Sequence, residues 1–243
     1  MIRCVGVKVH FSYQKYFSYQ KYFSFDQDGE ILLVGEMYFD SDTSNHTENK
    51  GKVTVYNITA DSTVGSPVLG SEVGDLVGGS VAMARDGSCF VYGATGAQDS
   101  SPGAAYIYCW NNTNDQWEEK ASLVGEGIGD AFGGAVAISH TGKYVIVGGH
   151  KNDVGDTKTN AGHSRVYKDV GGGTYQQMGD DINGDNGLVS VGYYKVGDSF
   201  GFDVAISYND ASERVRIVVG APNNQEQGYY FGQVSMIFSS LYQ

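Results

Sequence analysis

The sequence predicts an all-β protein built from one repeating unit, and three observations lead to this. The phrase Gly-Asp-x-Phe-Gly-x-x-Val-Ala-Ile-Ser occurs at 129–139 and again, with the same spacing, at 197–207. A weaker copy runs over 74–84, and each copy is followed by a polar turn and a second apolar run that ends in glycine. Glycine accounts for 35 of the 243 residues and proline for three, which suits tight turns between short strands. Self-similarity at a period of roughly 50 to 70 residues is typical of a repeat array.

The repeats are expected at 12–72, 73–127, 128–195 and 196–243, and the third shows the unit most clearly. Short runs of alternating or apolar residues, separated by turn residues, predict an antiparallel meander. In the third repeat the expected strands are 135–139, 144–147, 163–167 and 174–178. In the second they are 80–84, 89–92, 105–109 and 116–120. In the first, which is degenerate, they are 22–25, 31–34, 52–56 and a vaguer 64–69. In the last they are 203–207, 214–219 and 233–238, with no fourth.

Tandem four-stranded meanders without helical periodicity are typical of a β-propeller, here of about four blades. The missing last strand has a candidate at 5–10, which alternates apolar and polar residues. If this segment, within 1–11, pairs beside 233–238, it closes the ring and removes two exposed sheet edges. The alternative is that it belongs to a blade that the chain does not contain.

The repeated phrases resemble the FG-GAP repeats of integrin α-subunit-type β-propellers. Phe132-Gly133 and Phe200-Gly201 match the first half of that name, and Gly220-Ala221-Pro222 matches the second half. The stretches 160–167 and 175–184 resemble a subgroup common in marine microbial and algal surface proteins. The resemblance implies a binding or adhesion role toward a protein or glycan ligand, and an extracellular or cell-surface location. Propellers of that type have seven blades, whereas this chain has room for about four.

The resemblance also implies calcium, held in loops of pattern Asp-x-Asp-x-Asp-Gly-x-x-Asp between the second and third strands. Calcium takes six to eight oxygen ligands, which such loops supply. Incomplete versions provide two sets of candidate ligands, Asp40 and Asp42 in the first repeat and Asn152, Asp153 and Asp156 in the third. The alternative is that these are ordinary turn residues, because turns favour Asp, Asn and Gly.

The invariant residues of the phrase are expected to be structural. An aspartate after a glycine can accept backbone N–H groups and hold the turn between blades, and a residue that occurs once per repeat is more simply explained by folding than by catalysis. The structural set comprises Gly74, Asp75, Gly129, Asp130, Phe132, Gly133, Gly197, Asp198, Phe200 and Gly201.

Charge and motif content narrow the function classes. The net charge of −12 disfavours nucleic-acid binding, and direct membrane insertion is not expected because no apolar run reaches transmembrane length. Common catalytic motifs are missing from the sequence. Cys89 and Cys109 fall on neighbouring expected strands, where two buried thiols are the default and a disulfide is the alternative in a secreted protein.

The leading hypothesis is a non-catalytic binding or adhesion module, because a rigid propeller presents loops from several blades on one face. Two alternatives stay open. One is a propeller-type hydrolase or lyase with acidic residues gathered at a central channel. The other is a part of a larger propeller without a separate function.

Overall fold

The computed structural model describes residues 22–40, 48–96, 101–155, 158–187, 189–191, 194–224 and 232–240. These residues form four antiparallel sheets of three to five strands and one two-stranded hairpin, and no helix. None of the described segments therefore provides an apolar helix long enough to cross a membrane. The all-β prediction is confirmed.

The sheets follow the chain. The first contains β1 (Tyr22–Phe25), β2 (Ile31–Glu36), β3 (Lys52–Asn57), β4 (Ser62–Thr63) and β5 (Val68–Leu69). The second contains β6 (Val77–Met83), β7 (Cys89–Ala94), β8 (Ala104–Asn111) and β9 (Gln116–Val124). The third contains β10 (Phe132–Ile138), β11 (Tyr144–Gly149), β12 (His163–Asp169), β13 (Tyr175–Gln177) and β14 (Ile182–Asn183). The hairpin is β15 (Val189–Val191) with β16 (Tyr194–Val196), and the fourth sheet is β17 (Asp203–Asn209), β18 (Arg214–Ala221) and β19 (Gln233–Ser240).

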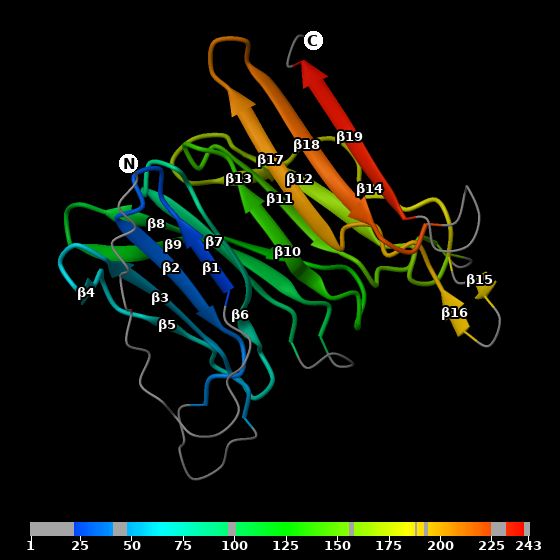
Figure 1. Ribbon diagram of the computed structural model, residues 1–243, viewed down its shortest axis with the longest axis horizontal. Helices are drawn as coiled ribbons and strands as arrows, with labels where there is room; N and C mark the ends of the chain where they lie inside the picture. Colours follow the sequence, from blue (N-terminus) through cyan, green and yellow to red (C-terminus); the bar gives the residue numbers. More distant parts are fainter. Residues whose placement is uncertain are drawn as a thin grey trace, which may run out of the picture.

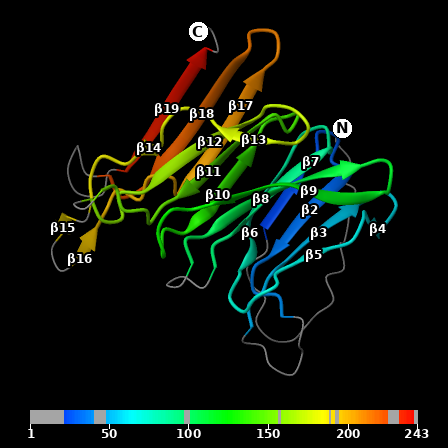
Figure 2. The same cartoon turned by 180° about the vertical axis from the view of Figure 1, so that it is seen from behind.

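Figures 1 and 2 show the four sheets side by side in chain order, from β1–β5 at one end to β17–β19 at the other. The first strands of neighbouring sheets contact one another: β1 meets β6, β6 meets β10, and β10 meets β17. Two hydroxyls tie these strands together, since Ser24 Oγ accepts from the Met83 N–H at 3.0 Å and Ser80 Oγ from the Val136 N–H at 3.1 Å. Among the described strands, the first sheet does not pack on the fourth, so they form an open row.

The core lies between the sheets, in three apolar clusters. Because side chains alternate along a strand, a strand whose sheet lies between two other sheets is apolar on both faces. In β11, Val145 and Val147 face the second sheet, whereas Tyr144 and Ile146 face the fourth. This double burial explains why the second run of the third repeat is continuously apolar in the sequence.

Three features differ from the expected meander. Of the strand expected at 64–69, only β5 forms, and the short β4 precedes this range; Pro67 lies between the two and cannot donate to a strand ladder. The hairpin β15–β16 is an addition that the repeat pattern did not predict. The first and third sheets have five strands where four were expected, whereas the second has the expected four and the fourth has three described strands, as expected. The closing segment 5–10 lies outside the described residues, so its pairing stays a prediction.

The expectation of two free thiols is wrong, because Cys89 and Cys109 form a disulfide. The two residues are directly opposite in the β7–β8 register, which places both side chains on one face of the sheet. The register of two strands is a property of the folded sheet. The sequence placed the cysteines on neighbouring strands without fixing that they oppose each other.

Candidate functional site

The repeated phrase has one backbone conformation in all three copies. The residue before the phenylalanine position is in the left-handed region: φ is 55° at Leu76, 56° at Ala131 and 54° at Ser199. The glycine after that position is also left-handed, with φ of 84° at Gly78, 86° at Gly133 and 84° at Gly201. A left-handed glycine carries no Cβ penalty, which accounts for its recurrence. The turn is therefore a rigid, repeated structural unit.

The three aspartates of the phrase accept hydrogen bonds that hold this turn. Asp75 Oδ2 accepts the backbone N–H of Ser71 at 2.9 Å and of Glu72 at 2.8 Å. Asp130 and Asp198 are buried, and each also accepts from the side-chain amide of an asparagine distant in the sequence.

Asp130 Oδ2 accepts the Gly127 N–H at 2.6 Å and the Asn152 amide at 3.1 Å. Asp198 Oδ2 accepts the Asn186 N–H at 2.8 Å and the Asn224 amide at 3.1 Å. The carboxylates therefore join the linker, the turn and the loop after the second strand.

Each sheet offers the next one a socket made of two glycines. One lies in the second strand and the other directly precedes the third strand. The pairs are Gly35 and Gly51, Gly93 and Gly103, Gly148 and Gly162, and Gly220 and Gly232. We call these the first to fourth sockets. The sequence signal was present, since a glycine recurs before the third strand of each sheet, but the predicted repeat unit included only the glycine of the second strand.

The first three sockets are filled by the phrase of the following sheet. Gly51 bridges Val77, Gly103 bridges Phe132 and Gly162 bridges Phe200 in parallel pairs. The N–H groups of Val77, Phe132 and Phe200 donate to the carbonyls of Lys50 (3.1 Å), Pro102 (3.0 Å) and Ala161 (2.9 Å).

The second-strand glycines are needed for this contact. A Cβ at Gly93 would overlap the carbonyl of Gly133, and a Cβ at Gly148 would overlap that of Gly201. A side chain at these positions and the incoming turn are therefore mutually exclusive.

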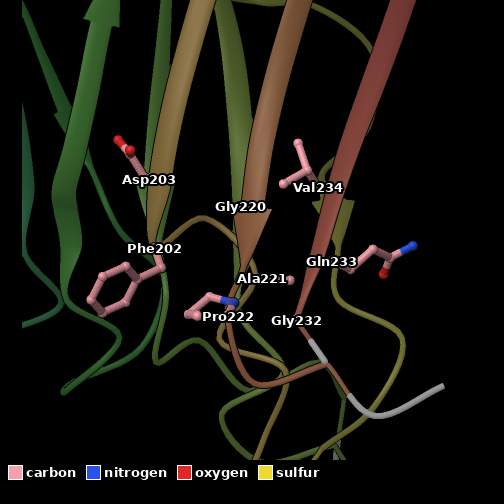
Figure 3. Close-up of a pocket in the computed structure, with 8 residues that line it drawn as sticks. All are labelled: Phe202, Asp203, Gly220, Ala221, Pro222, Gly232, Gln233 and Val234. Atoms are coloured by element: carbon pink, nitrogen blue, oxygen red, sulfur yellow. The ribbon is translucent and has the colours of Figure 1, made fainter. Parts of the chain in front are cut away.

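Among the described residues, no segment fills the fourth socket. The socket forms part of a pocket of about 310 Å³ at the end of the fourth sheet, which Figure 3 shows. The pocket is lined by Phe202, Asp203, Gly220, Ala221, Pro222, Gly232, Gln233 and Val234. A Cβ at Gly220 would meet no atom closer than the Asp203 carbonyl oxygen at 3.6 Å, which is an ordinary contact. No turn occupies this position among the described residues.

The third strand of the fourth sheet is correspondingly exposed. Val234 and Met236 occupy the positions that Ser164 and Val166 hold in the third sheet, because each faces the same place of the second strand. Ser164 and Val166 are 0% and 8% exposed, whereas Val234 and Met236 are 65% and 66% exposed. The open face of the fourth sheet, defined by Gly220, Val234 and Met236, is the candidate functional site.

A second cluster combines Glu126, His163 and Asp181, whose ligand atoms lie within 4.8 Å of one another. Arg165 already binds both carboxylates, through Nε and Nη2 to Asp181 at 2.8 and 2.9 Å and through Nη2 to Glu126. Burial lowers the pKa of His163, and the nearby Arg165 lowers it further, which favours the neutral imidazole. Because the guanidinium holds the carboxylates, the cluster is an ion pair that fixes the linker between the second and third sheets.

The candidate calcium ligands are only partly placed. Asp42 and Asp156 lie outside the described residues. Asp40 Oδ1 accepts the Asn49 N–H at 2.5 Å, and Asp153 Oδ1 accepts the Asn160 N–H at 2.8 Å. Asn152 is buried and bonded to Asp130, as above. The described members of each set therefore brace their own loops, and calcium binding stays a prediction.

Comparisons with known proteins add little to this geometry. No family model and no curated protein matches the chain. Among solved structures, it is similar to hydrazine synthase of Kuenenia stuttgartiensis, with 13% identity and a TM-score of 0.46. That match covers 89% of this chain and 50% of the other, so this chain spans about half the length of that protein.

Proposed function

We propose that this protein is a non-catalytic binding module, built from propeller-type repeats, that binds a protein ligand through the open face of the fourth sheet. The observation that carries the proposal is the exposure of Val234 and Met236, at repeat positions that are buried in the other three sheets. Contiguous exposed apolar surface on an otherwise covered sheet marks an interaction site. The adjoining pocket gives such a ligand a concave place to insert a side chain or turn.

We place this module outside the cell or in another oxidising compartment. The Cys89–Cys109 disulfide supports this, because disulfides persist in oxidising environments and are rare in the cytosol. The resemblance to FG-GAP repeats points the same way.

We also propose that calcium stabilises the loops after the second strands of the first and third sheets. A ligand that binds only the native state raises the melting temperature as its concentration rises. We expect calcium to raise it and a chelator to reverse the rise, as followed by differential scanning calorimetry. Asp153→Asn should reduce the response, whereas Asp115→Asn, in a turn of the second sheet, serves as the matched control. A melting temperature that ignores both calcium and chelator contradicts the proposal.

The binding proposal is tested with a library of displayed peptides selected against the full chain. We expect enriched peptides whose binding is lost in Met236→Lys, because a charge at this position disrupts an apolar contact. Ile128→Lys is the matched control, since Ile128 is an exposed aliphatic residue in the linker between the second and third sheets.

The control variant should retain binding. If no selected peptide loses binding in Met236→Lys, the proposed site is contradicted. Binding on a glycan array that persists in Met236→Lys points instead to a glycan ligand at another face.

A further inference from the structure

We infer that the fourth socket binds a Phe-Gly turn of its own repeat type, carried by a β-sheet unit with the phrase Gly-Asp-x-Phe-Gly-x-x-Val-Ala-Ile-Ser. This inference rests on the proposed function and names the partner of the same site. It commits to an incoming repeat as the occupant of the open face. The argument is that the chain itself contains three filled copies of the same socket.

The third and fourth sockets have the same construction. In the third sheet Gly148 pairs with Ser164, and Gly149 pairs with His163. In the fourth sheet Gly220 pairs with Val234, and Ala221 pairs with Gln233. In both, a glycine directly precedes the third strand, at Gly162 and Gly232. The two sockets therefore present the same backbone in the same register.

The filled third socket defines what a ligand must offer. Phe200 donates its N–H to the Ala161 carbonyl at 2.9 Å, and its side chain packs in the core cluster that contains Val166. A Cβ on Gly201 would overlap the carbonyl of His163, and φ there is 84°. A ligand thus needs an aromatic or large apolar residue followed by a glycine that adopts a left-handed conformation.

The fourth socket can meet these needs. Met236 occupies the position of Val166, so an incoming phenylalanine would cover it in place of water. Pro222 stands in place of His150, and Val234 in place of Ser164, so the fourth socket is more apolar than the third. Burial of apolar area on both partners favours docking of the turn.

A second folded copy of this chain does not supply the turn. Its three phrase turns fill its own sockets, as Val77-Gly78, Phe132-Gly133 and Phe200-Gly201 do here. The first repeat carries the duplicated segment Phe-Ser-Tyr-Gln-Lys-Tyr at 11–16 and 17–22 in place of the phrase. The occupant is therefore a repeat unit with a free phrase.

The experiment uses a labelled synthetic peptide of residues 196–221, which holds the phrase and the hairpin that follows it, titrated against the full chain. We expect saturable binding by fluorescence anisotropy. The matched control peptide replaces glycine at the position of Gly201 with alanine, and it should bind at least about tenfold more weakly because the added methyl group meets socket backbone.

The protein variant Gly220→Ala should fold with an unchanged melting temperature, since its Cβ has room, and should lose binding about tenfold or more because the Cβ would overlap the incoming carbonyl. Val234→Lys tests the same socket from the third strand. No saturable binding up to roughly 1 mM, or equal binding by Gly220→Ala, overturns the inference.

The two proposals fail separately. This inference alone is overturned if the selected peptides depend on Met236 but lack a Phe-Gly turn, and the peptide of residues 196–221 does not bind. If the peptide selection also yields no binder that depends on Met236, the proposed binding function is overturned as well. Concentration-dependent self-association that Gly220→Ala abolishes identifies a second copy as the occupant and also overturns the inference.

Discussion

Replacing Phe132 with alanine is expected to lower the free energy of unfolding by about 3 to 5 kcal/mol, the usual cost of truncating a large core side chain. Phe132 is fully buried and belongs to the apolar cluster between the second and third sheets. The Phe132 and His163 rings meet in a T-shaped arrangement with 5.6 Å between centroids, and the Arg165 guanidinium lies 5.5 Å from the centre of the Phe132 ring. Equilibrium unfolding in urea, followed by tryptophan fluorescence, measures the change.

Phe25→Ala is the matched control, because the same side chain is 51% exposed in β1. Its effect should stay within about 1 kcal/mol, as expected for a surface position. If the midpoint of Phe132→Ala equals that of the wild type, Phe132 does not hold the second and third sheets together.

Gly93→Ala is expected to destabilise the fold by about 3 kcal/mol or more, at the upper end of the cost of overpacking. The added Cβ would overlap the carbonyl of Gly133, and a backbone atom cannot move aside as a flexible side-chain end can. The junction between the second and third sheets must then open, or the turn must shift as a whole. Thermal unfolding by circular dichroism, with urea titration of the soluble fraction, gives the loss.

Gly220→Ala provides the contrast, since it makes the same chemical change at the same position of the repeat. Its Cβ has no neighbour closer than 3.6 Å, so the melting temperature should stay near that of the wild type. Similar losses for the two variants would show that the second-strand glycine matters for the strand itself and not for the neighbouring turn.

Much of the fold could be predicted from the sequence because turn residues mark the ends of the strands in each repeat. Expected strands at 144–147 and 163–167 correspond to β11 and β12, whose apolar runs are bounded by turn residues. The split of the first sheet's outer strand also had a signal, since Gly65-Ser66-Pro67 interrupts it and a Cβ on Gly65 would meet the Trp117 ring at 2.8 Å.

The candidate site could not be predicted in the same way. Val234 and Met236 lie in an ordinary strand pattern, and the local sequence does not indicate that they are exposed while Ser164 and Val166 are buried. What differs is whether another sheet covers them, which depends on contacts between segments distant in the sequence. The same holds for the Arg165 ion pairs, because Glu126 precedes the third sheet in the sequence and Asp181 lies between β13 and β14.

Each described junction between sheets includes one turn seated in one socket, and this repetition has a thermodynamic consequence. Stability in such a row is a sum of terms within each sheet and terms between nearest neighbours, as in a one-dimensional lattice. The second and third sheets each gain from two described junctions, while the described part of the fourth gains from one. A unit with a single neighbour opens at lower free energy than the interior of the row. An occupant of the fourth socket would add a nearest-neighbour term on the outer side of the fourth sheet. Binding there would therefore raise the cooperativity of unfolding along the row of sheets.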